Sequence, residues 1–427
     1  MSRPLTIWVL QTGEPLHTDI GSPRPMRAMN LANALVAAGH KVVLWSSSFY
    51  HQEKRHRVPD SECIIVSASL EIRLLASPGY SRNIGPGRLW DHAVLARNLD
   101  KALSLEAQGP DVAFVGYPPI ETAAVMARWL AERKIPFMVD VKDQWPTIFT
   151  DPLPAVLRPL GRLALAPYFH YGKRALRDAS GLSAMAGGFL KWAAAFAGRP
   201  VGALDRVVPL TVPVGQVPPA ELAAAGLWWD EKGIRADGTP RLCFVGSHSS
   251  AFDMEAVAVA AKALAQSGNP CQFILCGEGE YTSTWKQKMV DLPTVHFPGW
   301  IDRGKIEALA LRSTAALAPY RNGEDFMMSI PNKVIDALAL GLPVLSPLKG
   351  EVQHLIASAS VGMSYGPSMG RTLEQCVAEL TGAAGLRDEL SANALRLFHE
   401  QFSFDTVYGG LVKHIELLTQ RPEASRP

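Results

Sequence analysis

Short apolar runs alternate with longer amphipathic stretches along the first half of the chain. Residues 5–10 (LTIWVL) and 41–46 (KVVLWS) have the length of strands, and residues 26–39 (MRAMNLANALVAAG) carry apolar positions at helical spacing. The same succession returns later as residues 112–117 (VAFVGY), 121–134 (ETAAVMARWLAERK) and 136–141 (PFMVDV). Repeated strand–helix–strand units predict a parallel sheet with helices on both faces.

The pattern breaks and then restarts in the second half. Residues 194–240 are less regular and rich in Ala, Pro and Gly. Beyond them, residues 241–247 (RLCFVGS), 251–268 (AFDMEAVAVAAKALAQSG) and 271–277 (CQFILCG) again read as strand, helix and strand. The sequence therefore predicts an α/β protein with two doubly wound domains that are joined near residues 215–240.

Length and composition agree with this organisation. The 427 residues suffice for two or three domains, and 48% hydrophobic and 19% charged residues are ordinary for a globular α/β protein. No apolar run reaches the ~18–20 residues of a membrane span, and the opening TIWVLQ is too short for the core of a signal peptide. The five cysteines show neither a disulfide framework nor metal-ligand spacing, which favours a cytoplasmic protein without a metal site.

The charged residues are unevenly divided. Residues 1–220 contain 24 Lys and Arg against 17 Asp and Glu, whereas the remainder contains 18 against 23. Two bodies with different partners explain this asymmetry, and so does chance variation in surface charge. The basic half carries no helix-turn-helix, zinc or RNA-binding signature, which argues against a nucleic-acid partner.

Candidate ligand-binding residues follow the predicted strands, because ligands of parallel sheets bind beyond the carboxyl ends of the strands. No G-x-G-x-x-G opens a helix at these places and no Walker pattern occurs, so neither a nicotinamide nor a kinase-type site is predicted. The segments that follow strands are residues 11–25, 116–118, 140–146, 246–248, 277–279, 299–300 and 324–347.

Residues 324–347 (EDFMMSIPNKVIDALALGLPVLSP) predict a loop, a short helix and a strand. Pro331 suits the first turn of the helix, and Ser329 is expected to cap its free amides. Lys333 adds positive charge at the helix start, and Asp336 lies three residues on, on the same face. Amides and Lys333 on a diphosphate, with Asp336 on a ribose, would hold a nucleoside diphosphate. A surface helix with an i,i+3 ion pair explains the same spacing.

Two residues in the first half have alternative interpretations. Arg27 stands near the start of a predicted helix, where it can reach an anionic ligand or lie on the surface. Asp143 follows a buried strand in VDVKDQWP, where it is either a functional carboxylate beside Trp145 or the cap of a turn.

A basic stretch without acids separates Asp151 from Asp178. Its cations are mixed with Leu, Tyr and Phe, which is typical of a surface that contacts anionic lipid headgroups. A basic helix face packed on the domain is the alternative. The cations singled out here are Arg158, Arg162, Lys173 and Arg174.

Taken together, these segments resemble glycosyltransferase family 4, of the GT-B fold, and within it the enzymes that assemble bacterial surface polysaccharides such as O-antigen, capsule and exopolysaccharide. The resemblance covers nearly the whole chain. It is carried by residues 26–47, 79–99, 110–146, 241–250, 271–280, 294–320 and 329–352 and by the ending FSFDTVYGGLVKHIELL.

The resemblance implies two Rossmann-like domains that face each other across a cleft. It places an acceptor-side domain at residues 1–215, a nucleotide-sugar-binding domain at residues 216–400 and a helix that returns to the first domain within residues 401–427. It also implies retention of anomeric configuration, no required metal and no cofactor, with a UDP- or GDP-linked sugar as the donor substrate.

Site residues follow from the resemblance position by position. Pro331, Asn332 and Lys333 match the helix start that meets the diphosphate, Lys333 also having a catalytic role there. Asp336 matches the acid that holds the ribose. Gly246 matches the glycine that faces the sugar diphosphate.

Further positions match the family in the same way. Gly299, Trp300 and Ile301 match the segment whose backbone lies by the base, and Gly21 matches the glycine loop over the donor phosphates. Asp143 matches the acidic position beside Trp-Pro near the reacting centre.

The chain also departs from the family pattern. The first acid of the family's paired-acid motif would fall at Met328, so Glu324 or Asp325 is expected to serve instead. The basic residues that follow the first strand of the second domain are missing, and His248 stands alone there. On the acceptor or lipid side we expect Arg27 together with the four cations of the basic stretch.

The resulting expectation is a retaining glycosyltransferase that moves a sugar from a nucleotide donor to a glycan acceptor, linked to lipid diphosphate, in surface polysaccharide assembly. It would be cytoplasmic and peripheral at the inner face of the plasma membrane. Two rivals remain. A nucleotide-sugar epimerase of the same fold would act on the free nucleotide sugar, and a binding or scaffold subunit would bind nucleotide without turnover.

Overall fold

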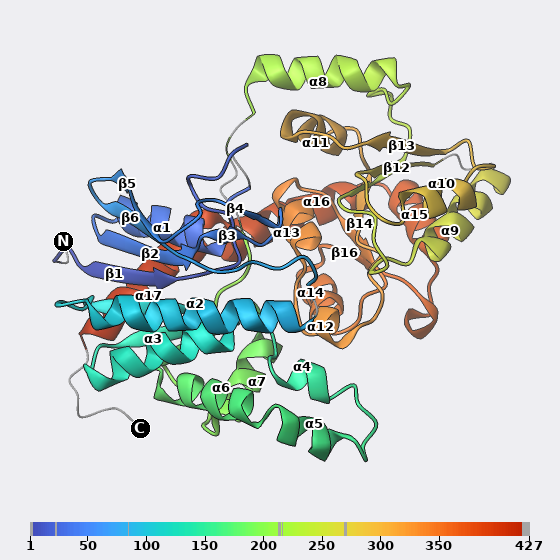
Figure 1. The fold of residues 1–427 in the computed structure, drawn as a ribbon. Helices are drawn as coiled ribbons and strands as arrows, with labels where there is room; N and C mark the ends of the chain where they lie inside the picture. Colours follow the sequence, from blue (N-terminus) through green and yellow to red (C-terminus); the bar gives the residue numbers. More distant parts are fainter. Residues whose placement is uncertain are drawn as a thin grey trace. The chain divides into compact units, whose positions relative to one another are not determined.

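Two largely parallel sheets organise the chain, one in each of two units (Figure 1). The computed structural model describes residues 3–21, 24–83, 85–211, 215, 217–268 and 271–420. The first unit, called the N-unit below, comprises residues 1–212 with 407–427, and the second, the C-unit, comprises residues 213–406. The prediction of an α/β chain with two doubly wound domains is confirmed.

The N-unit sheet has eight strands in the order β10-β9-β8-β7-β1-β2-β6-β5. Neighbouring strands are parallel except β5, which runs antiparallel to β6. A separate antiparallel pair, β3 and β4, follows β2 in the chain. The strands are β1 (Thr6–Leu10), β2 (Lys41–Ser47), β3 (Phe49–Tyr50), β4 (Arg55–His56), β5 (Glu62–Ser67), β6 (Leu70–Leu75), β7 (Val112–Tyr117), β8 (Phe137–Val141), β9 (Gly181–Ala184) and β10 (Arg206–Val207).

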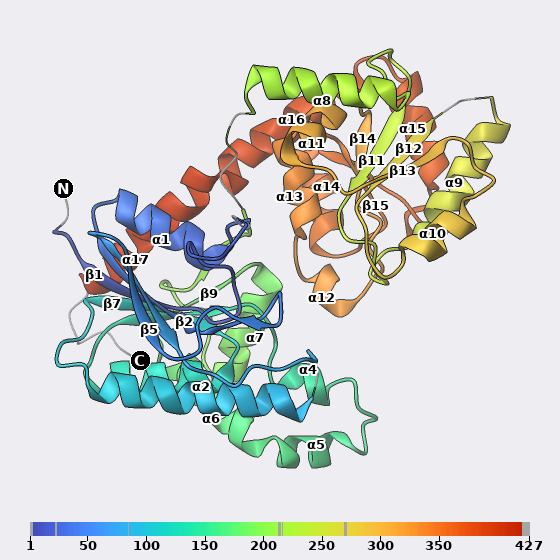
Figure 2. The ribbon, with the colours of Figure 1, turned by 45° about the horizontal axis from the view of Figure 1, so that its top comes forward.

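Helices cover the N-unit sheet, and one of them comes from the far end of the sequence. Helix α17 packs against α1 and β7 (Figure 2). The His414 ring nitrogen Nε2 lies 2.9 Å from Leu204 O, and His40 pairs with Glu416 at 3.1 Å. The helices are α1 (Arg27–Ala37), α2 (Pro86–Ser104), α3 (Ile120–Glu132), α4 (Thr147–Thr150), α5 (Arg158–Ala164), α6 (Ala166–Asp178), α7 (Gly187–Ala197) and α17 (Gly410–Thr419).

The C-unit sheet has six parallel strands in the order β13-β12-β11-β14-β15-β16. The strands are β11 (Arg241–Val245), β12 (Gln272–Cys276), β13 (Val295–Gly299), β14 (Ala315–Leu317), β15 (Val344–Ser346) and β16 (Gly362–Ser364). The helices are α8 (Pro219–Glu231), α9 (Met254–Gln266), α10 (Thr282–Lys288), α11 (Arg303–Ala310), α12 (Glu324–Met327), α13 (Asn332–Ala339), α14 (Glu351–Ala359), α15 (Leu373–Gly382) and α16 (Leu386–Leu397).

The apolar runs form the cores for the reason that the sequence pattern suggests. A parallel strand that is covered on both faces must be apolar at almost every position, and β1 is buried at Ile7, Trp8, Val9 and Leu10. The Trp8 ring stacks on Trp129 with their centroids 5.2 Å apart. All five cysteines are free thiols, four of them buried. In the described part of the chain, no helix has the length and apolar character that crossing a membrane would require.

Each sheet has one place where its strand order reverses. In the N-unit this switch point lies between β1 and β7, and in the C-unit it lies between β11 and β14. Loops on either side of a switch point leave the sheet in opposite directions, so a crevice opens beyond the carboxyl ends of these strands. The residues that follow β1, β7, β11 and β14 therefore carry the candidate sites.

Candidate functional site

Three glycines interlock at the carboxyl edge of the C-unit sheet. Gly246, Gly277 and Gly299 all have positive φ (146°, 118° and 85°), a region that side chains rarely adopt. The Gly246 amide donates to Cys276 O at 3.0 Å, and the Gly277 amide donates to Gly299 O at 2.8 Å. A Cβ on Gly277 would lie 2.0 Å from Gly246 O. The ends of these strands therefore expose backbone only, and a side chain at one of the glycines would force the strand ends apart.

Lys333 crosses this bare edge. Its ammonium donates to Val245 O at 2.5 Å and lies 4.7 Å from the centre of the Phe244 ring. A Cβ on Gly246 would lie only 1.5 Å from the Lys333 Nζ. The structure therefore brings together two of the residues predicted to face the diphosphate, Lys333 and Gly246.

Helix α13 begins at Asn332, with Pro331 as its N-cap and no capping side chain from the described residues. The expectation that Ser329 caps this helix is wrong. Its hydroxyl donates instead to Asp325 O at 2.9 Å and closes the preceding short helix α12. The first turn of α13 therefore keeps the uncapped amides and the positive dipole end that favour anions.

Asp336 is half-buried on α13, close to a tyrosine that the sequence did not single out. The pKa of Tyr320 is raised, chiefly by burial and further by the Asp336 carboxylate. The Tyr320 ring also contacts Phe252 and Phe326, with centroids 4.8 Å apart in both pairs. No sequence signal pointed to Tyr320, because its contacts join three separate segments.

The segment expected to lie by the base has mixed exposure. Gly299 ends β13 and Ile301 is buried, whereas the Trp300 side chain is 76% exposed. The buried Ile301 fixes the segment to the core. The backbone between these anchors is what the family resemblance assigns to the base.

Glu324 and Asp325 open the short helix α12, and both are exposed. Met328 is the C-cap of the same helix, and its amide donates to Glu324 O at 3.1 Å. Acidic side chains at a helix start are favourable on electrostatic grounds alone. Their use as substitutes for an acid at position 328 stays a prediction.

His248 is a core residue of the C-unit. Its side chain is buried, its Nδ1 lies 2.9 Å from the Thr282 hydroxyl oxygen, and its ring centroid is 4.4 Å from that of Trp285. Burial lowers the pKa of His248, and the nearby Lys333 lowers it further. A histidine held neutral in this way cannot replace the missing basic residues, so Lys333 remains the cation at this edge that the structure supports.

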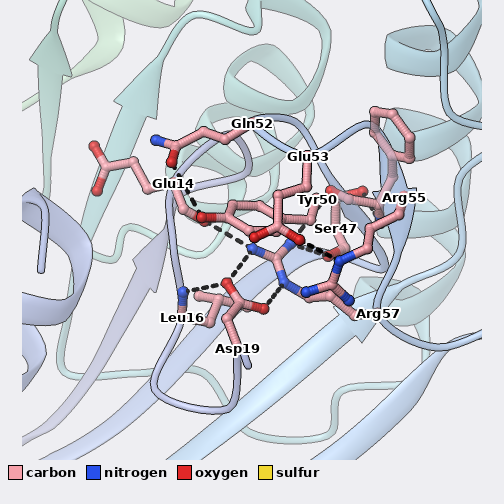
Figure 3. Close-up of polar contacts among 10 residues, drawn as sticks. Glu14, Leu16, Asp19, Ser47, Tyr50, Gln52, Glu53, Arg55 and Arg57 are labelled. Atoms are coloured by element: carbon pink, nitrogen blue, oxygen red, sulfur yellow. Dashed lines mark hydrogen bonds and ion pairs between the residues drawn. The ribbon is translucent and has the colours of Figure 1, made fainter. Parts of the chain in front are cut away.

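In the N-unit, a bidentate ion pair shapes the loop that follows β1. Arg57 Nε and Nη2 donate to the two Asp19 carboxylate oxygens at 2.6 and 2.9 Å, and Nη2 also donates to Glu14 O at 2.9 Å (Figure 3). The guanidinium lies 4.5 Å from the centre of the Tyr50 ring. Gly21, expected to face the donor phosphates, is an exposed residue of this loop with φ of 85°.

Arg27 is not where we expected it. Its side chain is buried, pairs with Asp140 at 3.0 Å and donates to Val208 O at 2.7 Å. A guanidinium that is enclosed in this way joins α1 to the sheet. The assignment of Arg27 to the acceptor or lipid side is therefore withdrawn.

Asp143 lies beside Trp145, as the sequence suggested, and its functional role stays a prediction. Its Oδ2 accepts a hydrogen bond from the Trp145 indole at 3.2 Å, and its Oδ1 accepts one from the Gln144 amide at 2.8 Å. The carboxylate is half-buried beyond the end of β8. It is thus a carboxylate at the sheet edge whose two oxygens are held by its neighbours in the chain.

The basic stretch is an exposed surface. Helix α5 has no buried residue, and α6 buries only Gly172, Ala175 and Leu176. The predicted cations Arg158, Arg162, Lys173 and Arg174 are all exposed. Large apolar side chains are exposed among them, namely Phe149, Val156, Leu157, Leu160, Leu163 and Tyr171. We call this set the apolar-basic surface.

Within the described residues, no group of three or more His, Cys, Asp and Glu side chains is placed to hold a metal ion. The features that suit a ligand are instead the start of α13, Lys333 and the three glycines. No sequence signal distinguished Arg57 from the other cations of residues 51–60 (HQEKRHRVPD).

Two family models match the chain, one in each unit. Residues 26–211 match the glycosyl transferase 4-like domain, and residues 239–380 match the glycosyl transferases group 1. No curated protein sequence gives a significant match.

Many solved structures share the fold. Sucrose-phosphate synthase from Thermosynechococcus elongatus aligns over 97% of this chain and 99% of its own, with 16% identity and a TM-score of 0.64. Anabaena HepE in complex with UDP and glucose aligns over 97% and 100%, with 16% identity and a TM-score of 0.59. WaaG, involved in lipopolysaccharide biosynthesis, aligns over 96% and 99%, with 15% identity and a TM-score of 0.59. At these identities the likeness establishes a GT-B fold.

Proposed function

Because its N-unit belongs to the glycosyl transferase 4-like domains and its C-unit to the glycosyl transferases of group 1, this chain is a glycosyltransferase of the GT-B type, and we propose that it is a retaining enzyme. The donor is a UDP- or GDP-linked sugar, and the acceptor is a glycan carried on a lipid diphosphate. The HepE structure holds UDP and glucose, which supports such a donor. The part that WaaG takes in lipopolysaccharide biosynthesis supports a role in surface glycan assembly.

The observation that carries the proposal is the position of Lys333. It places a cation against Gly246 and the end of β11, beside the uncapped start of α13. Both features attract anionic oxygens. Asp336 lies three residues further on, within reach of vicinal hydroxyls of a ribose whose phosphates lie at the helix start.

This arrangement has a direct consequence for the rate. When the bond between sugar and phosphate oxygen breaks, negative charge develops on the leaving diphosphate. Donors that are already in place stabilise that charge, and losing one costs about 10²–10³-fold in rate. In a front-face retaining route the leaving phosphate oxygen accepts the proton of the acceptor hydroxyl, so a separate protein base is not required.

Calorimetric titration of the purified protein with UDP, GDP, dTDP, CMP and NAD tests the donor site. We expect one nucleoside diphosphate to bind, and we expect Lys333→Ala and Asp336→Ala to weaken it by about 10-fold or more each, as for a charged hydrogen bond. Lys262→Ala and Asp291→Ala, exposed positions of the C-unit, are matched controls that should bind like the wild type. Equal binding by all five proteins would refute the site.

Turnover separates the proposal from its rivals. With the donor identified, transfer to a lipid-diphosphate glycan should give a product of unchanged anomeric configuration, measured by NMR. Since Lys333 and the helix start supply positive charge, turnover should continue in EDTA. Change of the free nucleotide sugar without an acceptor would identify an epimerase, and tight binding without turnover would identify a binding subunit.

The apolar-basic surface supports peripheral contact with an anionic membrane. Leu160 and Leu163 are 66% and 72% exposed on α5, alongside Arg158 and Arg162. Apolar side chains with flanking cations favour the headgroup region of anionic bilayers, at about 1 kcal/mol per cation.

Flotation with vesicles tests this contact. The protein should float with phosphatidylglycerol vesicles at low salt and remain behind with phosphatidylcholine. Arg158→Gln with Arg162→Gln should weaken the partition by about 30-fold, whereas the exposed Arg97→Gln on α2 should not. Equal flotation with both lipids, or none, would remove the membrane from the proposal.

A further inference from the structure

A cavity of about 80 Å³ lies at the switch point of the N-unit sheet. It is bounded by the residues that follow β1, β2, β6 and β7 and by the first half of α2. The sequence analysis pointed to part of its lining only through the segments 11–25 and 116–118 that follow strands, and none of the individual site residues named there lines it. Its lining consists of Gln11, Thr12, Gly13, Ser47, Phe49, His51, Tyr80, Arg88, Asp91, His92, Leu95, Pro118 and Pro119.

Helix α2 fixes the wall of this cavity. Asp91 Oδ1 accepts a hydrogen bond from the Gly79 amide at 2.7 Å, and the Asn98 side chain donates to Ala76 O at 2.7 Å. Both bonds tie the loop after β6 to the helix. The cavity is therefore built into the unit before any ligand arrives, which lowers the cost of binding.

Two cations meet beside the cavity, Arg88 in its lining and Lys54 against the lining residues His51 and Tyr80, without a carboxylate between them. Lys54 Nζ donates to Asn83 Oδ1 at 2.6 Å, and Arg88 Nη1 donates to Asn83 O at 2.9 Å. Lys54 lies 4.5 Å and Arg88 5.7 Å from the centre of the Tyr80 ring. Among the described residues neither cation has an ion pair. Both cations donate to oxygens of Asn83, which carries no charge, so their positive charges are not neutralised and this rim is electropositive.

Two histidines extend the polar wall. His51 Nδ1 lies 2.5 Å from the Tyr80 hydroxyl and 3.1 Å from Lys54 Nζ. The His92 side chain is more than nine-tenths buried, and its Nδ1 has no hydrogen-bond partner among the described residues, with Glu121 Oε2 3.6 Å away. This nitrogen therefore faces a carboxylate of α3, and His51 is the histidine whose surroundings favour an anion.

The charges near His51 indicate the sign of the ligand. Burial, Lys54, Arg88 and His92 lower its pKa to about 4, against which only Asp91 acts in the opposite direction. Asp91 already accepts the Gly79 amide. Two cations, Lys54 and Arg88, act on His51 against this one carboxylate, so the positive potential is in excess and an anion would relieve it.

The cavity also adjoins the expected reacting centre. The Arg88 guanidinium lies 4.9 Å from the centre of the Trp145 ring, and the Trp145 indole donates to Asp143 at 3.2 Å. A molecule whose anionic group sits beside Arg88 would thus be anchored one aromatic ring away from Asp143.

We propose that this cavity is a subsite that holds a phosphate group of the acceptor, with Arg88 and His51 as ligands in its lining and Lys54 beside them. The proposal rests on the transferase function proposed above and names the acceptor chemistry that the N-unit recognises. A lipid diphosphate and a soluble sugar phosphate share this chemistry.

Calorimetry with inorganic pyrophosphate tests the subsite, in a Lys333→Ala background that weakens the donor site. We expect Arg88→Gln and Lys54→Gln to weaken binding by about 10-fold each and the exposed Arg97→Gln on the same helix to leave it unchanged. Histidine resonances in NMR should report a rise in the pKa of His51 when pyrophosphate binds, because an anion favours the protonated ring.

The outcomes are separable from those of the donor site. UDP binding that is lost in Lys333→Ala and kept in Arg88→Gln, together with pyrophosphate binding that ignores Arg88→Gln and Lys54→Gln, would overturn the subsite and keep the transferase. Binding of methyl glucoside in place of pyrophosphate would also overturn it. Tighter binding of geranyl diphosphate than of glucose 6-phosphate supports the lipid source, and the reverse order supports the soluble one.

Discussion

The carboxyl edges of the two sheets are built in opposite ways. In the N-unit, the loop after β1 is held by buried charges, with Glu14 paired to Lys142 and Asp19 to Arg57. In the C-unit, the corresponding edge is made of glycines with positive φ, and Lys333 lies directly on the backbone.

The difference shows two ways to prepare an edge for a ligand. Buried ion pairs fix the shape of a long loop, but the paired charges are then not available to bind a ligand. Bare backbone leaves room and donors for an anion, at the cost of residues that tolerate only glycine. The loop after β1 is therefore expected to fail by unfolding when its ion pairs are altered, and the C-unit edge by losing its ligand.

The largest effect is expected from Arg27→Met in the N-unit. The change leaves the Asp140 carboxylate buried without its partner, which costs about 3–5 kcal/mol. The free energy of unfolding, measured by urea titration, should fall by that amount. The double variant Arg27→Met with Asp140→Leu removes both charges and should recover much of the loss. A single variant as stable as the wild type would contradict the structural role given to this pair.

Gly246→Ala breaks the C-unit edge and is the next largest effect. Its Cβ would displace the Lys333 ammonium, so nucleoside diphosphate binding should weaken by about 30–150-fold, or about 2–3 kcal/mol. Calorimetry measures the loss. Gly238→Ala is the matched control, because Gly238 also has positive φ (78°) but nothing lies within 4 Å of its Cβ position. Both variants should lose some stability, and only Gly246→Ala should lose the ligand.

Arg57→Lys probes how the N-unit loop is held, with a smaller effect. Lysine keeps the charge but cannot donate to both Asp19 oxygens and to Glu14 O at once, so about 1–2 kcal/mol of stability should be lost. Hydrogen exchange should show faster opening of residues 11–21. Arg55→Lys, two residues away, alters an exposed pair with Glu53 and should change neither quantity. Similar exchange in both variants would show that Arg57 does not hold the loop.

The sequence predicted the features that depend on local pattern. Apolar runs and helical spacing located the two doubly wound domains, because both kinds of periodicity follow from burial of one chain segment at a time. The sequence also allowed the pairing of Lys333 with Gly246 to be predicted. Gly246 follows the strand β11, and Lys333 lies in the first turn of α13, so both were expected at the carboxyl edge of the sheet.

The features that the sequence did not predict depend on contacts between distant segments. Arg27 was expected on the acceptor or lipid side, but its buried guanidinium on α1 pairs with Asp140 of β8. Ser329 looked like a helix cap, but its hydroxyl closes the turn before it. The cavity beside Arg88 joins four loops and a helix, so no single stretch of sequence reveals it.

The smallest expected effect is a dependence of stability on pH, and it sharpens the contrast at the N-unit edge. The pKa of His51 is about 4 in the folded chain, because of burial and of Lys54 and Arg88, and it is 6.5 in the absence of these effects. Between these values the unfolded chain binds a proton that the folded chain does not. Stability is therefore fully present above pH 6.5 and is lost as pH falls toward 4. After allowance for solvent screening of this half-buried group, the loss should be about 1 kcal/mol. Urea titrations at about pH 7 and about pH 5 measure it.

The control is a comparison with His51→Gln, because the buried His248 of the C-unit contributes with the same sign. The free energy of unfolding should depend less steeply on pH in His51→Gln than in the wild type. Pyrophosphate should flatten the wild-type slope further, because an anion beside Lys54 and Arg88 raises the pKa of the folded histidine. The same pH dependence of the free energy of unfolding in both proteins would mean that the cations at this rim do not act on His51. That result would contradict the inference that the cavity is electropositive.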